Sequence, residues 1–204
     1  GDLYAAGNWQ NNLSTTGFVE GIGRVTMMGN QVQTINASDP IETFHHLTIN
    51  NSSGDNAAIT LTTPVHVSGV LNLSNGRVFT TMANLLTVTN TSTAAVVGGS
   101  GSSYVNGPVR RYIHGTAPGA YILPVGKSNV GLYKPATVTT VNLASNDFFT
   151  GEYFNVPGGN ITPTAGADFF DAILFGILKD EYWQIDRGNT VSGAGNTEAK
   201  VTLP

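Results

Sequence analysis

The sequence predicts an all-β protein, in which a parallel β-helix or β-solenoid is followed by an antiparallel β-sandwich-like module. Three observations support this prediction. A short phrase in which apolar residues alternate with Thr, Asn or other polar residues recurs along the first half. Charged residues make up only 11% of the 204 residues, against roughly 25% in an average domain. No long stretch repeats with the 3.6-residue period of a helix.

The recurring phrase ends at Asn in each of four copies, which are Val25–Asn30, Leu47–Asn51, Leu71–Asn75 and Leu86–Asn90. Their starts lie 22, 24 and 15 residues apart (47−25, 71−47, 86−71). Alternation places each apolar pair on one face of a strand. Strands that recur at about the length of one coil indicate a solenoid, because each coil buries its apolar face only against the next. We therefore expect Leu47, Leu71 and Leu86 to form one interior column.

The other elements of residues 1–100 follow from local signals. Residues 1–43 are expected to form an irregular first coil or a cap, in which the side chains of Trp9 and Phe18 cover the end of the core. The predicted strands are Gln31–Asn36, Ile59–Leu61 and Val65–Val67. Pro64 marks a corner, because it lacks a backbone donor, and Asn75-Gly76 is a turn signal.

The run Gly98–Ser103 predicts a flexible connector, so we place the end of the regular coils near it. Residues 1–100 would then be the solenoid repeats. Residues 101–204 would be the sandwich-like module, truncated at its C-terminal end. Its longer Gly and Pro loops and denser aromatic residues favour antiparallel strands. The expected strands lie at Tyr104–Ile113, Tyr121–Lys127, Tyr133–Thr139 and Glu181–Arg187. Residues Asp168–Leu178 fit either a strand pair or one short helix.

Two segments of the chain resemble a known family. Phe44–Asn51 and Pro64–Leu73 resemble the repeats "F-x-x-L-x-I-N-N" and "V-x-V-x-G-x-L-x-L" of large surface proteins of Bacteroidota bacteria. Ser103–Arg111, Leu123–Lys127, Tyr133–Pro135 and Glu181–Arg187 are similar to the module that follows those repeats. The resemblance implies export by the type IX secretion route, an extracellular or cell-surface location and an adhesin-like role. It carries no information on a ligand.

Composition narrows the classes of partner. The formal net charge is −4 and the nine Lys and Arg residues are scattered, which argues against nucleic acid. No apolar run approaches the roughly 20 residues that span a bilayer, so we expect no membrane insertion. The chain has no Cys, which is compatible with an oxidising compartment but does not require one.

The sequence assigns no metal ligand and no cofactor. His45 and His46 are neighbours, so on a strand they face opposite sides, and alignment of Leu47 with Leu71 places His66 against Glu42 rather than another His. The run Gly98–Ser102 resembles a calcium-binding nonapeptide but lacks the Asp that supplies ligand oxygens. A structural calcium ion in the second half stays open, with three acids as candidate ligands: Asp168, Asp171 and Asp186.

The sequence also assigns no catalytic residue, so we predict that the chain is not an enzyme. The second half carries several acids, Asp147, Glu152, Asp168, Asp171, Asp180, Glu181 and Asp186, which are spread through predicted loops. Paired carboxylates could hydrolyse glycosides, yet the coils offer only Asp39, Glu42 and Asp55 near turns. No Ser or Thr lies in a Gly-x-Ser-x-Gly elbow.

Aromatic and basic residues allow two interpretations each. A carbohydrate-stacking platform could be built from Trp9, Trp183, Tyr104, Tyr112, Tyr121 and Tyr133, but core packing is the favoured use. Arg110 and Arg111 diverge as strand neighbours, so a salt-bridged or solvated surface is the default expectation.

These observations favour a non-enzymatic structural and adhesive segment of an extracellular bacterial surface protein. Its partners would be surface glycans or neighbouring copies of the same chain. A self-assembling fibre subunit is the second hypothesis, because an uncapped solenoid end is an adhesive edge. A polysaccharide-active β-helix enzyme is the third.

Overall fold

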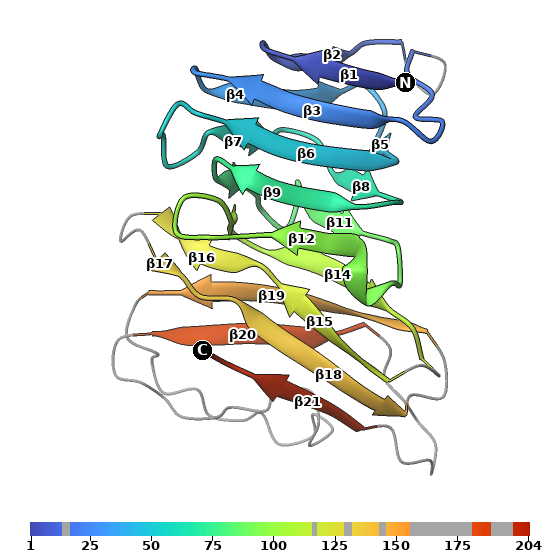
Figure 1. Cartoon of the computed structure of the whole chain (residues 1–204), viewed down its shortest axis with the longest axis vertical. Helices are drawn as coiled ribbons and strands as arrows, with labels where there is room; N and C mark the ends of the chain where they lie inside the picture. Colours follow the sequence, from blue (N-terminus) through green and yellow to red (C-terminus); the bar gives the residue numbers. More distant parts are fainter. Residues whose placement is uncertain (14–16, 116–117, 129–131, 143–145, 156–180, 189–197) are drawn as a thin grey trace.

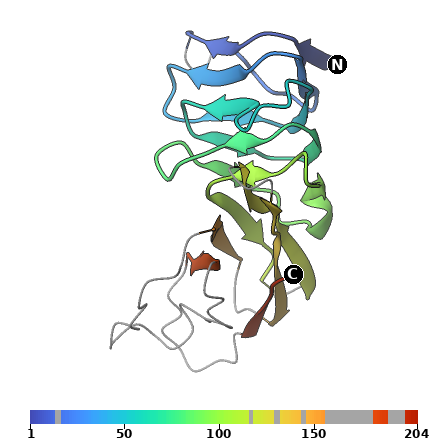
Figure 2. The same cartoon turned by 90° about the vertical axis from the view of Figure 1, so that its left-hand side faces the viewer.

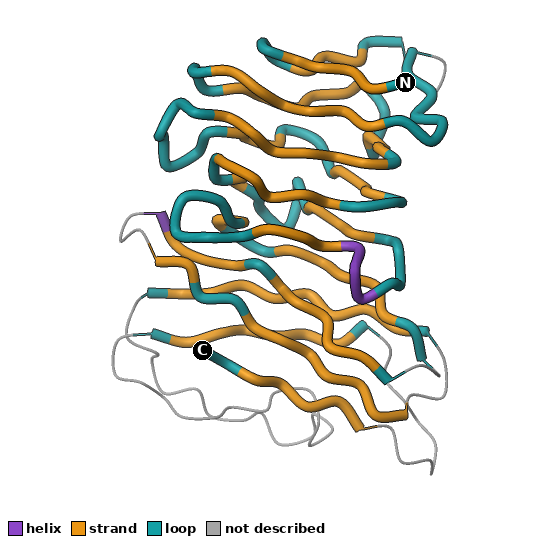
Figure 3. Tube along the Cα trace, in the orientation of Figure 1, coloured by secondary structure: helices purple, strands orange, loops and turns teal. Residues whose placement is uncertain are grey.

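The computed structural model describes residues 1–13, 17–115, 118–128, 132–142, 146–155, 181–188 and 198–204. The chain is all-β, and its first part is a β-solenoid whose coils stack along the long axis (Figure 1). Figure 3 shows that the described residues lie almost entirely in strands and loops, with a short 3-10 helix, η2 (Thr93–Ala95).

The first coil contributes β1 to one sheet and β2 to a second, and from β3 to β14 the strands of successive coils visit three sheets in turn. Sheet 1 contains β1 (Asp2–Ala5), β3 (Arg24–Gly29), β6 (His46–Asn51), β9 (Leu71–Asn75) and β12 (Val96–Gly98). Sheet 2 contains β2 (Trp9–Asn11), β4 (Gln33–Ala37), β7 (Ile59–Leu61), β10 (Val78–Phe79), β13 (Val105–Asn106), β16 (Val125–Lys127) and β17 (Leu132–Tyr133). Sheet 3 contains β5 (Glu42–Phe44), β8 (Val65–Val67), β11 (Leu86–Val88), β14 (Val109–Ile113), β19 (Asp147–Phe154) and β20 (Tyr182–Arg187).

Interior columns of aliphatic side chains hold the coils together. In sheet 1 the register places four residues in one row, Val25, Leu47, Leu71 and Val96. All four are at most 7% exposed. Burying one such side chain contributes about 1.5–3 kcal/mol, and each coil adds side chains of this kind from all three sheets. The predicted solenoid is confirmed at this level.

The predicted place of Leu86 in the interior column was wrong. Leu86 lies in sheet 3, where it pairs with Val65 and Val109, and Val96 occupies the next position of the column in sheet 1. The column therefore has spacings of 22, 24 and 25 residues (47−25, 71−47, 96−71). The error arose because strands on all three faces share the same alternation, so pattern alone does not identify the face.

The corners between sheets use the expected turn chemistry. Pro64 separates β7 from β8, as predicted. Gly76 separates β9 from β10 with a φ of +95°, a conformation that favours glycine. A Cβ at this position would lie 2.9 Å from the Asn51 carbonyl oxygen, so the tight stacking of coils also favours glycine here.

The N-terminal end of the interior is closed by aromatic and polar side chains. Trp9, Phe18 and Phe44 form a cluster with ring centroids 4.8 to 5.8 Å apart, which confirms Trp9 and Phe18 as covering residues. Glu42 is buried and accepts hydrogen bonds from Trp9 Nε1 at 2.9 Å and Asn11 Nδ2 at 3.0 Å. Gln33 is also buried, and its amide donates to carbonyl oxygens of the first coil. Polar groups thus attach the first coil to the second.

Outward-facing side chains of sheet 2 form a polar ladder. Asn36 Nδ2 donates to Gln10 Oε1 at 3.2 Å, and Thr62 Oγ1 donates to Asn36 Oδ1 at 3.1 Å. Stacked polar side chains of this type support a flat parallel arrangement. They also explain how a chain with so few charges keeps a polar exterior.

Antiparallel pairing begins after the fifth coil. β19 pairs antiparallel with β14 and then with β20, so sheet 3 continues without interruption. A fourth sheet contains β15 (Gly119–Leu123), β18 (Ala136–Asn142) and β21 (Glu198–Thr202), all antiparallel. All four predicted strand segments of the second half contain strands, but three of them are divided between two sheets, at Pro108, Pro124 and Pro135. The strands β19 and β21 were not predicted. Figure 2 shows the second half lying along the same axis as the coils.

The run Gly98–Ser103 does not form the expected open connector. Ser100 and Ser103 exchange backbone hydrogen bonds, and buried Ser103 Oγ donates to the Gly76 carbonyl oxygen at 3.1 Å. Parallel pairing continues past this turn to β16. The division into residues 1–100 and 101–204 stays a prediction. The predicted element at Asp168–Leu178 lies outside the described residues.

Candidate functional site

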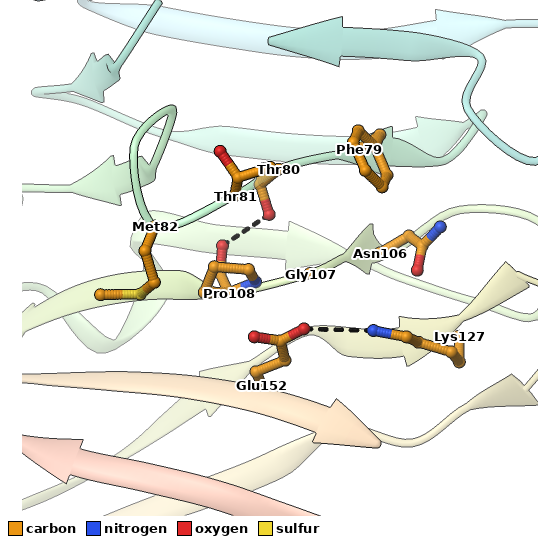
Figure 4. Close-up of a pocket in the computed structure, with 9 residues that line it drawn as sticks. All are labelled: Phe79, Thr80, Thr81, Met82, Asn106, Gly107, Pro108, Lys127 and Glu152. Carbon is orange, nitrogen blue, oxygen red and sulfur yellow. Dashed lines mark hydrogen bonds and ion pairs between the residues drawn. The ribbon is translucent and has the colours of Figure 1, made fainter. Parts of the chain in front are cut away.

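A shallow pocket of about 310 Å³ lies at the corner between sheets 2 and 3. It forms where the β10–β11 loop, the β13–β14 corner, β16 and β19 meet (Figure 4). The lining residues are Phe79, Thr80, Thr81, Met82, Asn106, Gly107, Pro108, Lys127 and Glu152. Phe79 and Met82 are 39% and 62% exposed, so part of the apolar lining faces solvent.

The corner that shapes the pocket follows from Gly107 and Pro108. Gly107 has a φ of +133°, and a Cβ there would lie 2.4 Å from the Thr80 carbonyl oxygen. Thr80 is buried, and its Oγ1 donates to the Pro108 carbonyl oxygen at 2.7 Å. These contacts fix the β10–β11 loop against the next coil, and so they fix the pocket wall.

An ion pair crosses one side of the pocket. Lys127 Nζ lies 3.1 Å from Glu152 Oε1 and 5.1 Å from the centre of the Phe154 ring. Beside it, Asn106 Nδ2 donates to Ser128 Oγ. Glu152 is the single carboxylate among the nine lining residues, and hydrolysis of a glycoside ordinarily uses two. The lining combines exposed apolar side chains with hydrogen-bonding and charged groups.

The sequence assigned no residue to this pocket. Phe79 and Met82 lie at the end of β10 and in the loop that follows it, where two large apolar residues within four positions are a signal that could have indicated an exposed contact surface. Lys127 and Glu152 are 25 residues apart, and their meeting depends on the antiparallel return of β19. No short-range pattern predicts that contact.

The structure corrects two details of the predicted arrangement of the histidines. His45 and His46 do not face opposite sides, because His45 lies at the corner before β6, and their ring centroids are 4.3 Å apart. The rings have other partners: His45 Nδ1 contacts Ser68 Oγ, and His46 Nδ1 accepts from the Val70 amide. Burial, followed by the charge of His45, lowers the pKa of His46.

His66 lies against Thr43 and Thr87 rather than against Glu42. The alignment was off by one residue because the loops between coils differ in length. Burial, followed by the charge of Arg110, lowers the pKa of His66. Within the described ranges, no three His, Cys, Asp or Glu residues lie close enough together to hold a metal ion.

The described acids of the second half lie on strands or strand ends rather than in loops. Three of them form ion pairs with basic residues: Asp147 with Arg187 at 2.6 Å, Glu152 with Lys127 at 3.1 Å and Glu181 with Lys134 at 3.2 Å. Asp186 is exposed and accepts from Gln184. The other candidate calcium ligands, Asp168 and Asp171, and the acid Asp180 lie outside the described residues.

Most of the candidate aromatic platform belongs to the core or packs against it. Tyr104 and Tyr121 are buried, and Trp9 and Trp183 pack against the core. Trp183 Nε1 also donates to the Lys134 carbonyl oxygen at 2.9 Å. Tyr112 is different, because it lies on the outer face of sheet 3 with its ring 5.3 Å from that of Phe148.

Arg110 and Arg111 diverge as predicted, but only Arg110 lies on the surface. Arg111 points into the core and is 1% exposed. Its Nη2 donates to the carbonyl oxygens of Ser92 and Thr93 at 2.7 and 2.9 Å. The expectation of a salt-bridged or solvated side chain was therefore wrong for Arg111.

No protein-family model, curated protein or solved structure matches this chain. In the part of the chain that the structure describes, no helix has the length and apolar character needed to cross a membrane.

Proposed function

We propose that this chain is a non-enzymatic structural and adhesive segment of an extracellular bacterial surface protein. In this proposal the β-solenoid is a stiff spacer, and surface glycans are the partners that it contacts. The resemblance to Bacteroidota surface repeat proteins exported by the type IX route supports the location and the role. The proposal includes an antiparallel sandwich-like module over residues 101–204.

One observation carries the proposal most directly. The parallel columns of sheet 1 run in register from β1 to β12, and sheets 2 and 3 extend beyond them into the second half. Such stacking produces an elongated body rather than a globule with a deep cleft. The shallow corner pocket, with its apolar walls and single ion pair, adds a contact surface to that body.

A binding experiment tests this function. The purified chain is mixed with insoluble polysaccharides and with polystyrene particles, and the fraction that sediments with each is measured. We expect co-sedimentation with at least one surface and no release of reducing ends. Release of reducing ends that a Glu152→Gln substitution abolishes would instead support the polysaccharide-active enzyme.

Self-assembly is the second candidate function, and β1 favours it. β1 pairs with β3 on one side only, so at the edge of sheet 1 its other backbone groups are unpaired by any described strand. Leu3 and Tyr4 on this strand are 44% and 66% exposed. Exposed edges of this kind pair with other chains. Sedimentation velocity over a hundredfold concentration range separates the two functions, since a fibre subunit gives growing species and an adhesive spacer gives one.

A further inference from the structure

The outer face of sheet 3 carries a regular strip of side chains across β14, β19 and β20. The antiparallel register places alternate residues of the three strands in four adjacent rows. The rows are Tyr112 with Phe148, Arg110 with Thr150 and Asp186, Glu152 with Gln184, and Phe154 with Tyr182. We call these residues the outer strip. Its opposite face contributes Arg111, Phe149 and Tyr153 to the core.

Aromatic pairs occupy both ends of the outer strip. The rings of Phe154 and Tyr182 are stacked, with centroids 4.7 Å apart and an interplanar angle of 11°. Those of Phe148 and Tyr112 are 5.3 Å apart. All four side chains are half-buried. These rings point away from the core and form two apolar areas at the surface, each with a cation beside one ring: Arg110 beside Phe148 and Lys127 beside Phe154.

The rows between the aromatic pairs are polar and electrically balanced. Arg110 and Asp186 lie in one row, with the Arg110 guanidinium 4.3 Å from the Phe148 ring centre and its Nε donating to Thr150 Oγ1 at 3.0 Å. Glu152 lies in the next row and pairs with Lys127 at the rim of the corner pocket. Arg110 and the neighbouring Lys127, which is not part of the strip, offset the two carboxylates Asp186 and Glu152, so the strip together with Lys127 offers donors and acceptors without net charge.

The length of the outer strip indicates an extended ligand. Alternate residues on one strand are about 6.8 Å apart, so the first and last rows, three steps apart, are separated by about 20 Å. A single sugar ring could not reach both aromatic pairs, whereas a chain of several rings could. The corner pocket continues the strip beyond Glu152 toward Phe79 and Met82.

We infer that the outer strip binds an uncharged glycan chain that runs along β19, with sugar rings on the two aromatic pairs and hydroxyl groups at the polar rows. A sugar ring presents C–H faces that pack on aromatic rings and hydroxyl groups that require donors and acceptors. The balanced charge of the strip favours a neutral glycan over an acidic one. This inference rests on the proposed adhesive function and names its ligand and its site.

The test measures the affinity of the whole chain for soluble polysaccharides by affinity electrophoresis. The neutral probes are a mixed-linkage β-glucan, a galactomannan and an arabinoxylan, and the acidic probes are alginate and polygalacturonate. We expect wild type to be retarded by at least one neutral probe and by neither acidic probe. Tyr182→Ala and Phe148→Ala should each weaken that binding by about tenfold, the effect of losing one aromatic stacking contact.

Matched variants separate binding from folding. Tyr4→Ala removes an exposed aromatic side chain from β1, at the far end of the chain, and should leave the affinity unchanged. Gln184→Ala alters an exposed polar residue of the strip, so it should weaken binding without lowering the melting temperature. Circular dichroism of every variant reports folding.

If wild type, Tyr182→Ala, Phe148→Ala and Gln184→Ala all bind a neutral probe equally tightly, the outer strip is not the binding site. The adhesive function would still stand. Retardation by the acidic probes alone, or by no probe, would overturn the neutral-glycan ligand. In both cases, co-sedimentation of the chain with insoluble polysaccharides or polystyrene would show that the adhesive function survives. Loss of that co-sedimentation as well would remove the function on which the inference rests.

Discussion

Arg111 is a buried cation whose contacts within the described residues are the carbonyl oxygens of Ser92 and Thr93 and the ring of Tyr121. Burial lowers its pKa from 12.5 to about 10, and its Nε and Nη1 atoms have no hydrogen-bond partner among the residues that the structure describes. Its role is to hold η2 through the carbonyl oxygens of Ser92 and Thr93. The charge is therefore retained at a cost in desolvation that two hydrogen bonds and the ring of Tyr121, 5.4 Å from the guanidinium carbon, offset.

We predict that Arg111→Met folds with a free energy of unfolding within about 1 kcal/mol of wild type at pH 7, because the lost hydrogen bonds and the removed desolvation cost offset one another. Ser92 O keeps the Ala95 amide as a donor. Arg111→Ala should lose about 3 kcal/mol, because it also leaves a cavity. Urea denaturation measures both. Equal losses for Met and Ala would show that the guanidinium, rather than the volume, is what stabilises this site.

A hydrogen bond from Tyr153 to Glu181 gives a second prediction at the scale of single residues. The hydrogen bond from the Tyr153 hydroxyl lowers the pKa of Glu181 below 4.5, although burial acts in the opposite direction. The hydrogen bond and the charge of Lys134 also lower this pKa. A carboxylate whose pKa is lower in the folded state stabilises the protein above its unfolded pKa. That stability is lost as the pH falls through the folded pKa.

Tyr153→Phe should therefore shift the acid limb of the stability curve to higher pH, since the pKa of Glu181 rises toward 4.5. The difference between variant and wild type should be largest above pH 4.5 and should shrink as the pH falls. Melting temperatures from pH 2 to 7 measure it. Lys200→Met, on β21 and remote from Glu181 in register, is the control. A variant curve parallel to wild type over this range would contradict the linkage.

At the scale of elements, the strands and corners could be predicted from the sequence. The sheet to which each strand belongs could not. Pro64, Asn75-Gly76 and the Gly107-Pro108 bend are local signals, and each lies at a corner. Leu86 carries the same alternation as Leu47, yet it lies on another sheet, because loop lengths vary and only stacking decides the register.

The corrected register predicts where an engineered disulfide bond can form. Thr48 and Asn72 pair across β6 and β9 on the outer face of sheet 1, where neighbouring strands are about 4.8 Å apart, a Cα separation that a disulfide accepts. The chain has no Cys of its own. Thr48→Cys with Asn72→Cys should therefore lose its free thiols on mild oxidation, as thiol labelling would show.

The matched control places one cysteine on another sheet. Asn72→Cys with Thr87→Cys should keep both thiols, because Thr87 belongs to sheet 3. Our first alignment of Leu71 with Leu86 would have placed these two residues side by side. Cross-linking of the control pair and not of Thr48 with Asn72 would restore that alignment and contradict the structure.

The candidate site could not be predicted because it is built by long-range pairing. Phe148 meets Tyr112 and Phe154 meets Tyr182 only through the antiparallel return of β19 and β20. The sequence left two uses open for six aromatic residues, namely core packing and a carbohydrate-stacking platform. Of those six residues, Tyr112 alone lies in the outer strip. The buried state of Arg111 was missed for the same reason, since its burial depends on the coil that carries η2.

At the scale of the whole molecule, the parallel coils and the antiparallel strands share continuous sheets. Parallel columns of Val, Leu and Ile extend from the first coil, and the same sheets then carry the antiparallel strands of the second half. Most of the outer strip lies on those later strands, and the corner pocket lies where β16 and β19 meet the β10–β11 loop and the β13–β14 corner. We therefore propose that the coils act as the spacer and that the second half makes the contact.

The most direct test of this account is retention under flow. The chain is displayed on a non-adherent bacterial cell, and the number of cells held on a polysaccharide-coated surface is counted as shear increases. We predict that wild type and Tyr4→Ala are retained equally, whereas the Phe148→Ala, Tyr182→Ala double variant is released at lower shear. Retention no greater than that of cells without the chain, at equal display, would contradict an adhesive role.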